Sequence, residues 1–316
     1  MRAAVTSSGS GGLWPDGCDF AFTIFDDPDG QSLSTTRLVY SFLADVGFRT
    51  TIAVWPLAVR RAPNSGGETC SNPDYLSFLQ HLQEIGFEIA FHNAAPHSAW
   101  REETIEALEL FDSYFGAAPS SMANHYNEEA IYWGTSRLTG WRRRLYNLLT
   151  LGRNNHKFCG HVEGHPRFWG DLCRDRIRYC RNFVYSDINT LRVCPWMPYS
   201  DPLTPWVRYW FAASDGHRAP TFLRALNDAN QDRLERDRGA CILYTHFGHG
   251  FVHAGQLNPE FRRAMERLAR KKGWFIPAST LLDFLMRSRT STALSETQRN
   301  VLETRWLWEK LLRGTS

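Results

Sequence analysis

Short apolar runs alternate with amphipathic segments along most of the chain. The runs have the length of β-strands and lie near 20–27, 50–55, 88–92, 121–125, 182–186, 207–213, 240–246 and 273–277. Between them, apolar residues recur every three or four positions, as Tyr75, Leu79, Leu82 and Ile85 do. That period predicts helices that pack through one face. The alternation of strand and helix predicts an α/β fold with a parallel sheet.

Helix-end signals support this order of elements. Asn72 and Pro73 are typical of the N-cap and first position of a helix, and they precede the 75–85 pattern. Three predicted helices end at a glycine that precedes an aromatic residue and a strand, at Gly47, Gly86 and Gly273. Glycine suits the left-handed conformation that ends many helices. Seven or eight such units favour one (β/α) barrel, with an open doubly wound sheet as the alternative.

Two segments depart from the repeating pattern. The stretch 134–181 is rich in Arg, Trp and His and is interpreted as an insertion of helices and loops. Ser295 opens a capping box, and Val301, Trp308 and Leu311 follow at near-helical spacing. We expect a flexible N-terminus at 1–17, one barrel domain at 18–288 and a C-terminal helix at 289–316. That helix either docks on its own barrel or forms a homodimer contact.

Composition narrows the class of protein. Apolar residues make up 43% of the 316 residues and the net charge is +3, which indicates a globular chain that does not bind nucleic acid. No run approaches the roughly 20 apolar residues of a membrane span, and residues 1–12 lack a secretory core. We therefore expect a cytoplasmic protein. The seven cysteines are scattered and predict free thiols, although Cys159, His161, His165 and Cys173 form an alternative zinc site.

Polar residues with catalytic chemistry follow several of the predicted strands. The chain places Asp26 and Asp27, His92, Asn124 and His125, Asp215, and His246 at such positions. The carboxyl ends of parallel strands converge on one face of a barrel. Acids at the end of a buried strand cost several kcal/mol unless a cation or donors compensate them. These residues therefore predict a site for metal binding and proton transfer.

Three motifs resemble those of the polysaccharide deacetylases of carbohydrate esterase family 4, which share the NodB-homology fold. The family's Thr-Phe-Asp-Asp-Gly motif is similar to Thr23-Ile24-Phe25-Asp26-Asp27-Pro28-Asp29-Gly30. Its His-Ser/Thr-x-x-His motif resembles His92–His97. Its Leu-x-His motif resembles Tyr244-Thr245-His246. Order and spacing agree across about residues 18 to 287.

The resemblance implies a deformed (β/α)7-8 barrel that holds one divalent metal ion. Zn²⁺ is the first expectation for this ion, and Co²⁺, Ni²⁺ and Fe²⁺ are the alternatives. It implies roles for residues at the matching positions. Asp26 would be the base, His246 the general acid and Asp215 a residue that orients His246. The metal ligands would be Asp27, His92 and His97. Asn93, Asn124 and Tyr126 would contact the substrate, with the Tyr126 N–H at the developing oxyanion.

The chain also departs from the family pattern. The two histidines of the second motif stand five residues apart instead of four, and Pro96 makes the loop between them irregular. His125 is therefore an alternative ligand to His97. The extra Pro28 leaves Asp29 as an alternative for either carboxylate role. The family's third motif holds an Arg that positions the catalytic Asp, and residues 122–127 contain none.

These expectations define a function. The chain would be a metal-dependent hydrolase of a non-peptide carbon–nitrogen bond that removes acetyl from an N-acetylated sugar or glycan precursor by metal-activated water. Its partner would be a small molecule or an oligosaccharide. The alternatives are a barrel that binds a glycan without turnover, and a hydrolase of another small amide or ureide.

Overall fold

Parallel strands follow one another around the sheet in chain order, as the alternating pattern predicts. The computed structural model describes residues 14–314. The main sheet contains β1 Phe20–Asp26, β2 Thr51–Val54, β3 Glu88–Phe91, β4 Ser121–Met122, β5 Tyr179–Tyr185, β6 Tyr209–Asp215, β7 Ala240–Thr245 and β10 Gly273–Phe275. All eight runs predicted as strands are confirmed, with boundaries that differ by a few residues. A two-stranded hairpin, β8 Val252–His253 and β9 Gln256–Leu257, stands apart from this sheet.

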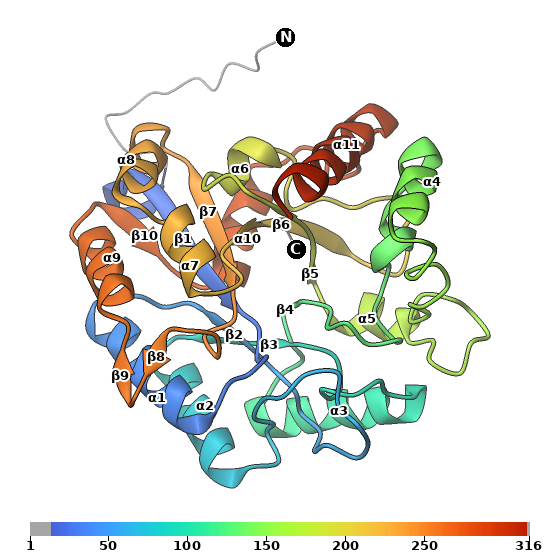
Figure 1. Cartoon of the computed structure of the whole chain (residues 1–316), viewed down its shortest axis with the longest axis horizontal. Helices are drawn as coiled ribbons and strands as arrows, with labels where there is room; N and C mark the ends of the chain where they lie inside the picture. Colours follow the sequence, from blue (N-terminus) through green and yellow to red (C-terminus); the bar gives the residue numbers. More distant parts are fainter. Residues whose placement is uncertain (1–13, 315–316) are drawn as a thin grey trace.

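The sheet closes into a barrel because β1 pairs with β7 as well as with β2 (Figure 1). The β1–β7 pairing runs over six residues, from Ala21↔Ala240 to Asp26↔Thr245. The β1–β2 pairing involves only Phe25 and Asp26, since β10 occupies the first half of β1. The fold is thus a closed parallel barrel of seven strands, deformed where β10 joins it, and the open-sheet alternative is wrong.

Helices surround the strands (Figure 1). Those in the connections that follow β1, β2, β3, β6, β7 and β10 are α1 Leu33–Asp45, α2 Pro73–Glu84, α3 Arg101–Phe115, α7 Ala219–Ala225, α8 Asp228–Arg236, α9 Pro259–Ala269 and α10 Ala278–Arg287. The others are η1 Pro15–Gly17, η2 Gly134–Arg137, α4 Gly140–Leu149, α5 Gly170–Arg176, α6 Thr190–Val193 and α11 Glu296–Arg313. Asn72 caps α2 as predicted, because its side chain accepts hydrogen bonds from the Asp74 and Tyr75 amides.

The three predicted helix-ending glycines do not all act in the same way. Gly47 and Gly86 have φ angles of 88° and 98°, in the left-handed region that glycine favours. Gly273 is instead the first residue of β10, and a Cβ there would lie 2.5 Å from the Phe275 ring. Close packing, not a left-handed turn, therefore requires glycine at this third position.

The segment that was expected as an insertion, 134–181, contains η2, α4 and α5, and it ends inside β5. β5 begins at Tyr179, three residues before the predicted strand. This difference matters below because it places Arg181 on a barrel strand.

The C-terminal helix α11 packs against this segment and the barrel (Figure 1). Glu303 is buried and accepts hydrogen bonds from the Thr139 amide and the Arg142 guanidinium. The Tyr185 hydroxyl on β5 donates to the Leu302 carbonyl. Docking on its own barrel is thus confirmed, while Trp308, 52% exposed, leaves the homodimer contact a prediction.

The expected flexible N-terminus, 1–17, lies outside the described residues except for its last four. Of these, Trp14 is buried, and its indole N–H donates to the Arg238 carbonyl. Within residues 14–314, no helix combines the length and the apolar character that crossing a bilayer requires.

Candidate metal and proton-transfer site

The end of β1 presents its carboxylates to two different environments. Successive side chains on a strand point to opposite faces. Asp26 points away from the barrel axis toward α1, where it accepts hydrogen bonds from the Tyr40 hydroxyl, 2.9 Å away, and the Gln31 amide. Asp27 points the other way, into the mouth of the barrel. Asp26, the expected base, is therefore not among the residues that line the central cavity.

A turn after β1 brings Asp29 back to the same mouth. The Gln31 N–H donates to the Pro28 carbonyl at 3.1 Å, which closes a four-residue turn. Gly30, at its third position, has φ of 70°, as type II turns require. The extra Pro28 is thus part of a turn that places Asp27 and Asp29, two residues apart, on one side of the cavity.

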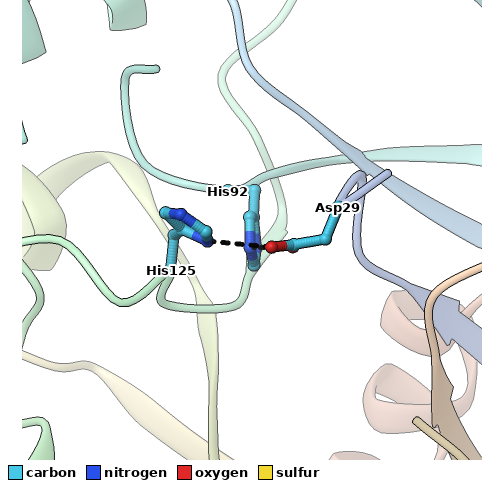
Figure 2. Close-up of side chains that lie close together, drawn as sticks. All are labelled: Asp29, His92 and His125. Atoms are coloured by element: carbon cyan, nitrogen blue, oxygen red, sulfur yellow. Dashed lines mark ion pairs between the residues drawn. The ribbon is translucent and has the colours of Figure 1, made fainter. Parts of the chain in front are cut away.

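Asp29, His92 and His125 converge at this mouth (Figure 2). The Asp29 carboxylate oxygens lie 3.5 Å from His92 Nε2 and 3.5 Å from His125 Nδ1. Two ligands that each lie about 2.1 Å from a tetrahedral ion are about 3.4 Å apart. The observed separations therefore fit a single divalent ion held by one carboxylate and two imidazoles, which is a donor set that zinc accepts.

Neighbouring side chains hold the two imidazoles in place. The Trp55 ring lies edge-on to His125, with centroids 5.2 Å apart, and tilted against His92 at 5.7 Å. Asn93 has φ of 61°, a conformation that Asn tolerates better than most residues. Its side-chain oxygen accepts a hydrogen bond of 2.7 Å from the His125 amide. Asn93, expected to contact substrate, therefore ties the loops after β3 and β4 together.

Asp27 forms a buried ion pair with Arg181 from β5. Arg181 donates to both carboxylate oxygens, at 2.9 Å and 2.5 Å, and both side chains are only 3% exposed. Asp27 also lies 3.8 Å from His92 Nδ1 and 4.0 Å from His246 Nε2. The arginine that the third motif lacks is thus supplied by a different strand, and it contacts Asp27, not Asp26.

His246, at the end of β7, completes the cluster. Its Nδ1 lies 2.7 Å from the His217 carbonyl, so in the neutral ring Nδ1 carries the proton and Nε2 faces the carboxylates. Nε2 lies 3.6 Å from Asp29 and 3.2 Å from the Tyr244 hydroxyl. Asp215, expected to orient His246, instead contacts the His217 ring at 2.9 Å and reaches His246 only through that residue.

Burial and the mutual charges of these groups shift their pKa values. Burial acts to raise the pKa of Asp29, but His92, His125 and His246 outweigh it, and the pKa falls far below its ordinary value. Burial lowers the pKa of His125 to about 4 and also lowers that of His246. Burial raises the pKa of Asp26 well above its ordinary value. Asp29 and His125 thus combine an ionised carboxylate with a neutral imidazole, the protonation states that metal ligands need.

The cavity bounded by these groups has a volume of about 140 Å³. Asn124 and Tyr126, expected to contact substrate, line it, although the Asn124 amide is also bonded to the Ile131 backbone. Its complete lining is Asp27, Asp29, His92, Asn124, His125, Tyr126, Trp133, Arg181, Val184, Tyr244 and His246.

His97 lies elsewhere. The Ala94 and Pro96 carbonyls accept hydrogen bonds from Leu57 and Asn64, which holds the irregular 93–97 loop against the loop after β2. The His97 ring is buried and 3.9 Å from Glu103. The described chain holds two groups of candidate metal ligands, Asp29 with His92 and His125, and Asp27 with Asp29 and His246, and His97 belongs to neither. The alternative ligand His125 occupies the place that the family motif predicted for His97.

The alternative zinc site is not formed by the described residues. Cys159, His161 and His165 line a second cavity, whereas the Cys173 thiol is buried beside the Met122 sulfur at 3.9 Å. Neither group of candidate metal ligands within residues 14–314 includes them.

Four cavity-lining residues were not predicted as site residues from the sequence, namely Arg181, Tyr244, Trp133 and Val184. Tyr244 was quoted only as part of a motif, and Trp133 has no local signal that separates it from a packing residue. Arg181 does carry a signal, because a charged residue inside a buried strand requires a partner.

Comparison with known proteins supports the fold. No family model matches the chain, and no curated protein is significantly similar in sequence. The structure is similar to that of a candidate polysaccharide deacetylase from Mycobacterium smegmatis, at TM-score 0.52 and 14% identity over 94% of this chain and 98% of that one. It is also similar to that of an allantoinase, at TM-score 0.50 and 12% identity over 88% and 94%. The chain therefore has the NodB-homology fold in a divergent form, as the motifs predicted.

Proposed function

We propose that the protein is a metal-dependent hydrolase of a non-peptide carbon–nitrogen bond. The observation that carries the proposal is the convergence of Asp29, His92 and His125 at ligand spacing, next to a carboxylate that is held by an arginine. A metal-binding group and a separate, oriented proton acceptor are the two components that amide hydrolysis by water needs.

Asp29, His92 and His125 would hold the metal. Zn²⁺ is the first choice for one carboxylate and two imidazoles, and Co²⁺, Ni²⁺ or Fe²⁺ accept the same donors. When bound there, the ion supplies Lewis-acid polarisation and lowers the pKa of water.

The chain's own residues would move the protons. Asp27 would accept a proton from the attacking water, and Arg181 keeps its carboxylate directed at the cavity. His246 Nε2, 4.0 Å from Asp27, would take up the proton that Asp27 has accepted and pass it to the departing amine, while Nδ1 keeps its hydrogen bond to the His217 carbonyl. Tyr126 lines the cavity, and its backbone N–H would stabilise the developing oxyanion. Asp27 thus takes the role that the family motif suggested for Asp26.

The substrate class proposed first is an N-acetylated sugar or glycan precursor, which loses its acetyl group. The structural similarity to a candidate polysaccharide deacetylase supports this class. The similarity to an allantoinase supports the second candidate, hydrolysis of another small amide or ureide on the same scaffold.

Metal analysis combined with an acetate-release assay on N-acetylated sugars tests the proposal. We expect about one transition metal ion per wild-type chain, lost in Asp29→Asn. Asp27→Asn should keep the metal and lose at least about a hundredfold in rate, because it removes the proton acceptor. Asp26→Asn is the matched control, one residue away and outside the cavity, and should keep both the metal and measurable turnover.

Two outcomes would contradict the proposal. Full metal content in Asp29→Asn would show that the ion binds elsewhere. Wild-type protein that lacks metal but binds an N-acetylated oligosaccharide would favour a barrel that binds a glycan without turnover.

A further inference from the structure

We propose that the second cavity, in the segment 134–165, binds an anionic group of the substrate while the scissile acyl group lies at the metal ligands. The inference rests on the proposed function for the reacting end of the substrate, but the binding of the anion does not depend on catalysis. It specifies the substrate as an N-acylated compound that carries a phosphate or carboxylate, in place of a neutral polymer.

The two cavities share a wall. Trp133 lines both the metal-site cavity and the second cavity, whose volume is about 430 Å³. Tyr126, on the metal side, donates a hydrogen bond to Asn154 and packs edge-on against Phe158, both of which line the second cavity. The two cavities are therefore adjacent, with these rings between them.

Two imidazoles in the second cavity have hydrogen-bond donors available. His161 Nδ1 accepts from the Tyr132 amide at 3.2 Å, and His165 Nδ1 accepts from the Arg167 amide at 3.1 Å. A neutral imidazole whose Nδ1 accepts a hydrogen bond carries its proton on Nε2. Burial, followed by the charge of Arg143, lowers the pKa of His161 to about 4, so this ring is neutral at neutral pH. Both rings thus offer an Nε2–H donor.

The charge of the cavity favours an anion. The Arg143 guanidinium lines it, and its lining contains no carboxylate, the members being Trp133, Thr135, Ser136, Arg143, Asn154, Asn155, His156, Phe158, Cys159, His161, Val162 and His165. Arginine and neutral donors together are a typical environment for phosphate or carboxylate.

A second cation lies behind the shared wall. The buried Arg137 guanidinium stacks on the Trp133 ring, 3.7 Å from its centroid. No ion pair joins it to a carboxylate within residues 14–314, and burial lowers its pKa to about 10. A cation held in a low-dielectric interior without a counter-ion gives the neighbouring cavity a positive potential. The positive charge of Arg137 is thus a second reason, independent of Arg143, to expect an anion in this cavity.

Titration calorimetry with two simple probes, inorganic phosphate and acetate, tests the inference. The protein is first treated with a chelator, so that neither probe binds to a metal. We expect saturable binding of at least one probe, weakened about tenfold or more in Arg143→Gln, because a hydrogen bond to a charged group is lost. Arg143→Lys should restore part of it, since the charge remains.

Arg144→Gln is the matched control. It removes the same charge from the adjacent position of α4, and Arg144 does not line the cavity. The affinity of Arg144→Gln for the probe should stay within about twofold of that of wild type. Tighter binding of phosphate would identify a phosphorylated substrate and tighter binding of acetate a carboxylated one, and either result supports the inference.

The inference is overturned if neither probe binds wild type at about 50 mM, or if Arg143→Gln and Arg144→Gln weaken binding equally. Its failure is distinguishable from failure of the proposed function. Asp29→Asn should bind the probe as wild type does, whereas it should lose the metal.

Discussion

The buried ion pair between Asp27 and Arg181 gives the sharpest test of the site's construction. Arg181→Met keeps an unbranched stem, which can still pack against Tyr244, whose ring centroid lies 4.2 Å from the guanidinium carbon. It removes both hydrogen bonds to the Asp27 carboxylate. That carboxylate is then left buried without its counter-ion.

The structure sets the size of the effect. Both side chains are only 3% exposed, so water in the cavity replaces the lost guanidinium only in part. Removing one partner of such a pair costs about 3–5 kcal/mol, whereas replacing both by neutral groups costs much less. A chain of this kind has about 5–15 kcal/mol of stability, so the single variant should fold but be clearly weakened.

Urea unfolding at pH 7.5 of chelator-treated protein measures this in a double-mutant cycle with Asp27→Asn. We expect the double variant to be more stable than Arg181→Met alone, with a coupling of at least about 2 kcal/mol. A loss below about 1 kcal/mol in Arg181→Met, or additive losses in the cycle, would refute this reasoning, because it would show that water solvates the Asp27 carboxylate as well as the guanidinium does.

Three further predictions concern other parts of the chain. Burial raises the pKa of Glu129 to about 7, so its contribution to stability is complete below about pH 4.5 and is lost as the pH rises through about 7. Between pH 5 and pH 7.5 in urea unfolding, the free energy of unfolding of wild type should fall by about 2 kcal/mol relative to that of Glu129→Gln, a difference that cancels the histidine titrations common to both proteins; equal changes in both would contradict it. Asn72→Ala should cost about 1 kcal/mol in thermal unfolding, because the α2 amides lose their cap, and an unchanged midpoint would show that the cap is dispensable. Trp308→Glu should shift sedimentation from dimer to monomer if α11 forms the homodimer contact that we propose, and a wild-type monomer would exclude that contact.

The sequence was sufficient for the fold because its signals are local and repeated. Each barrel strand is a short apolar run, and helix caps such as Asn72 mark where the intervening elements begin. Strand ends therefore predict from the sequence alone that His92, His125 and His246 lie on one face of the barrel, where the structure has them. Which strand ends meet follows from topology alone, since parallel strands share one polar end.

The roles of the first-strand acids could not be predicted in the same way. Asp26 and Asp27 are adjacent, and strand geometry permits only one of two neighbours to face the cavity. A motif comparison aligns residue types and does not determine which side chain faces the interior of the barrel. The turn that contains Gly30 decides which acids share the cavity, because it returns Asp29 to the side of Asp27. Asp26 is left on the opposite side of the strand, with Tyr40.

Arg181 shows how an error in a predicted strand boundary can conceal a buried charged residue. With the strand expected at 182–186, Arg181 fell in the insertion, where a charged residue needs no explanation. With β5 beginning at Tyr179, the same arginine lies on a barrel strand whose residues are all buried, and a charged side chain there is most easily accommodated by a carboxylate partner. Of the three acids after β1, Asp27 is the one that faces it across the barrel. A three-residue shift in one strand thus reveals a buried arginine that orients Asp27, which supports the proposal of Asp27 as the proton acceptor.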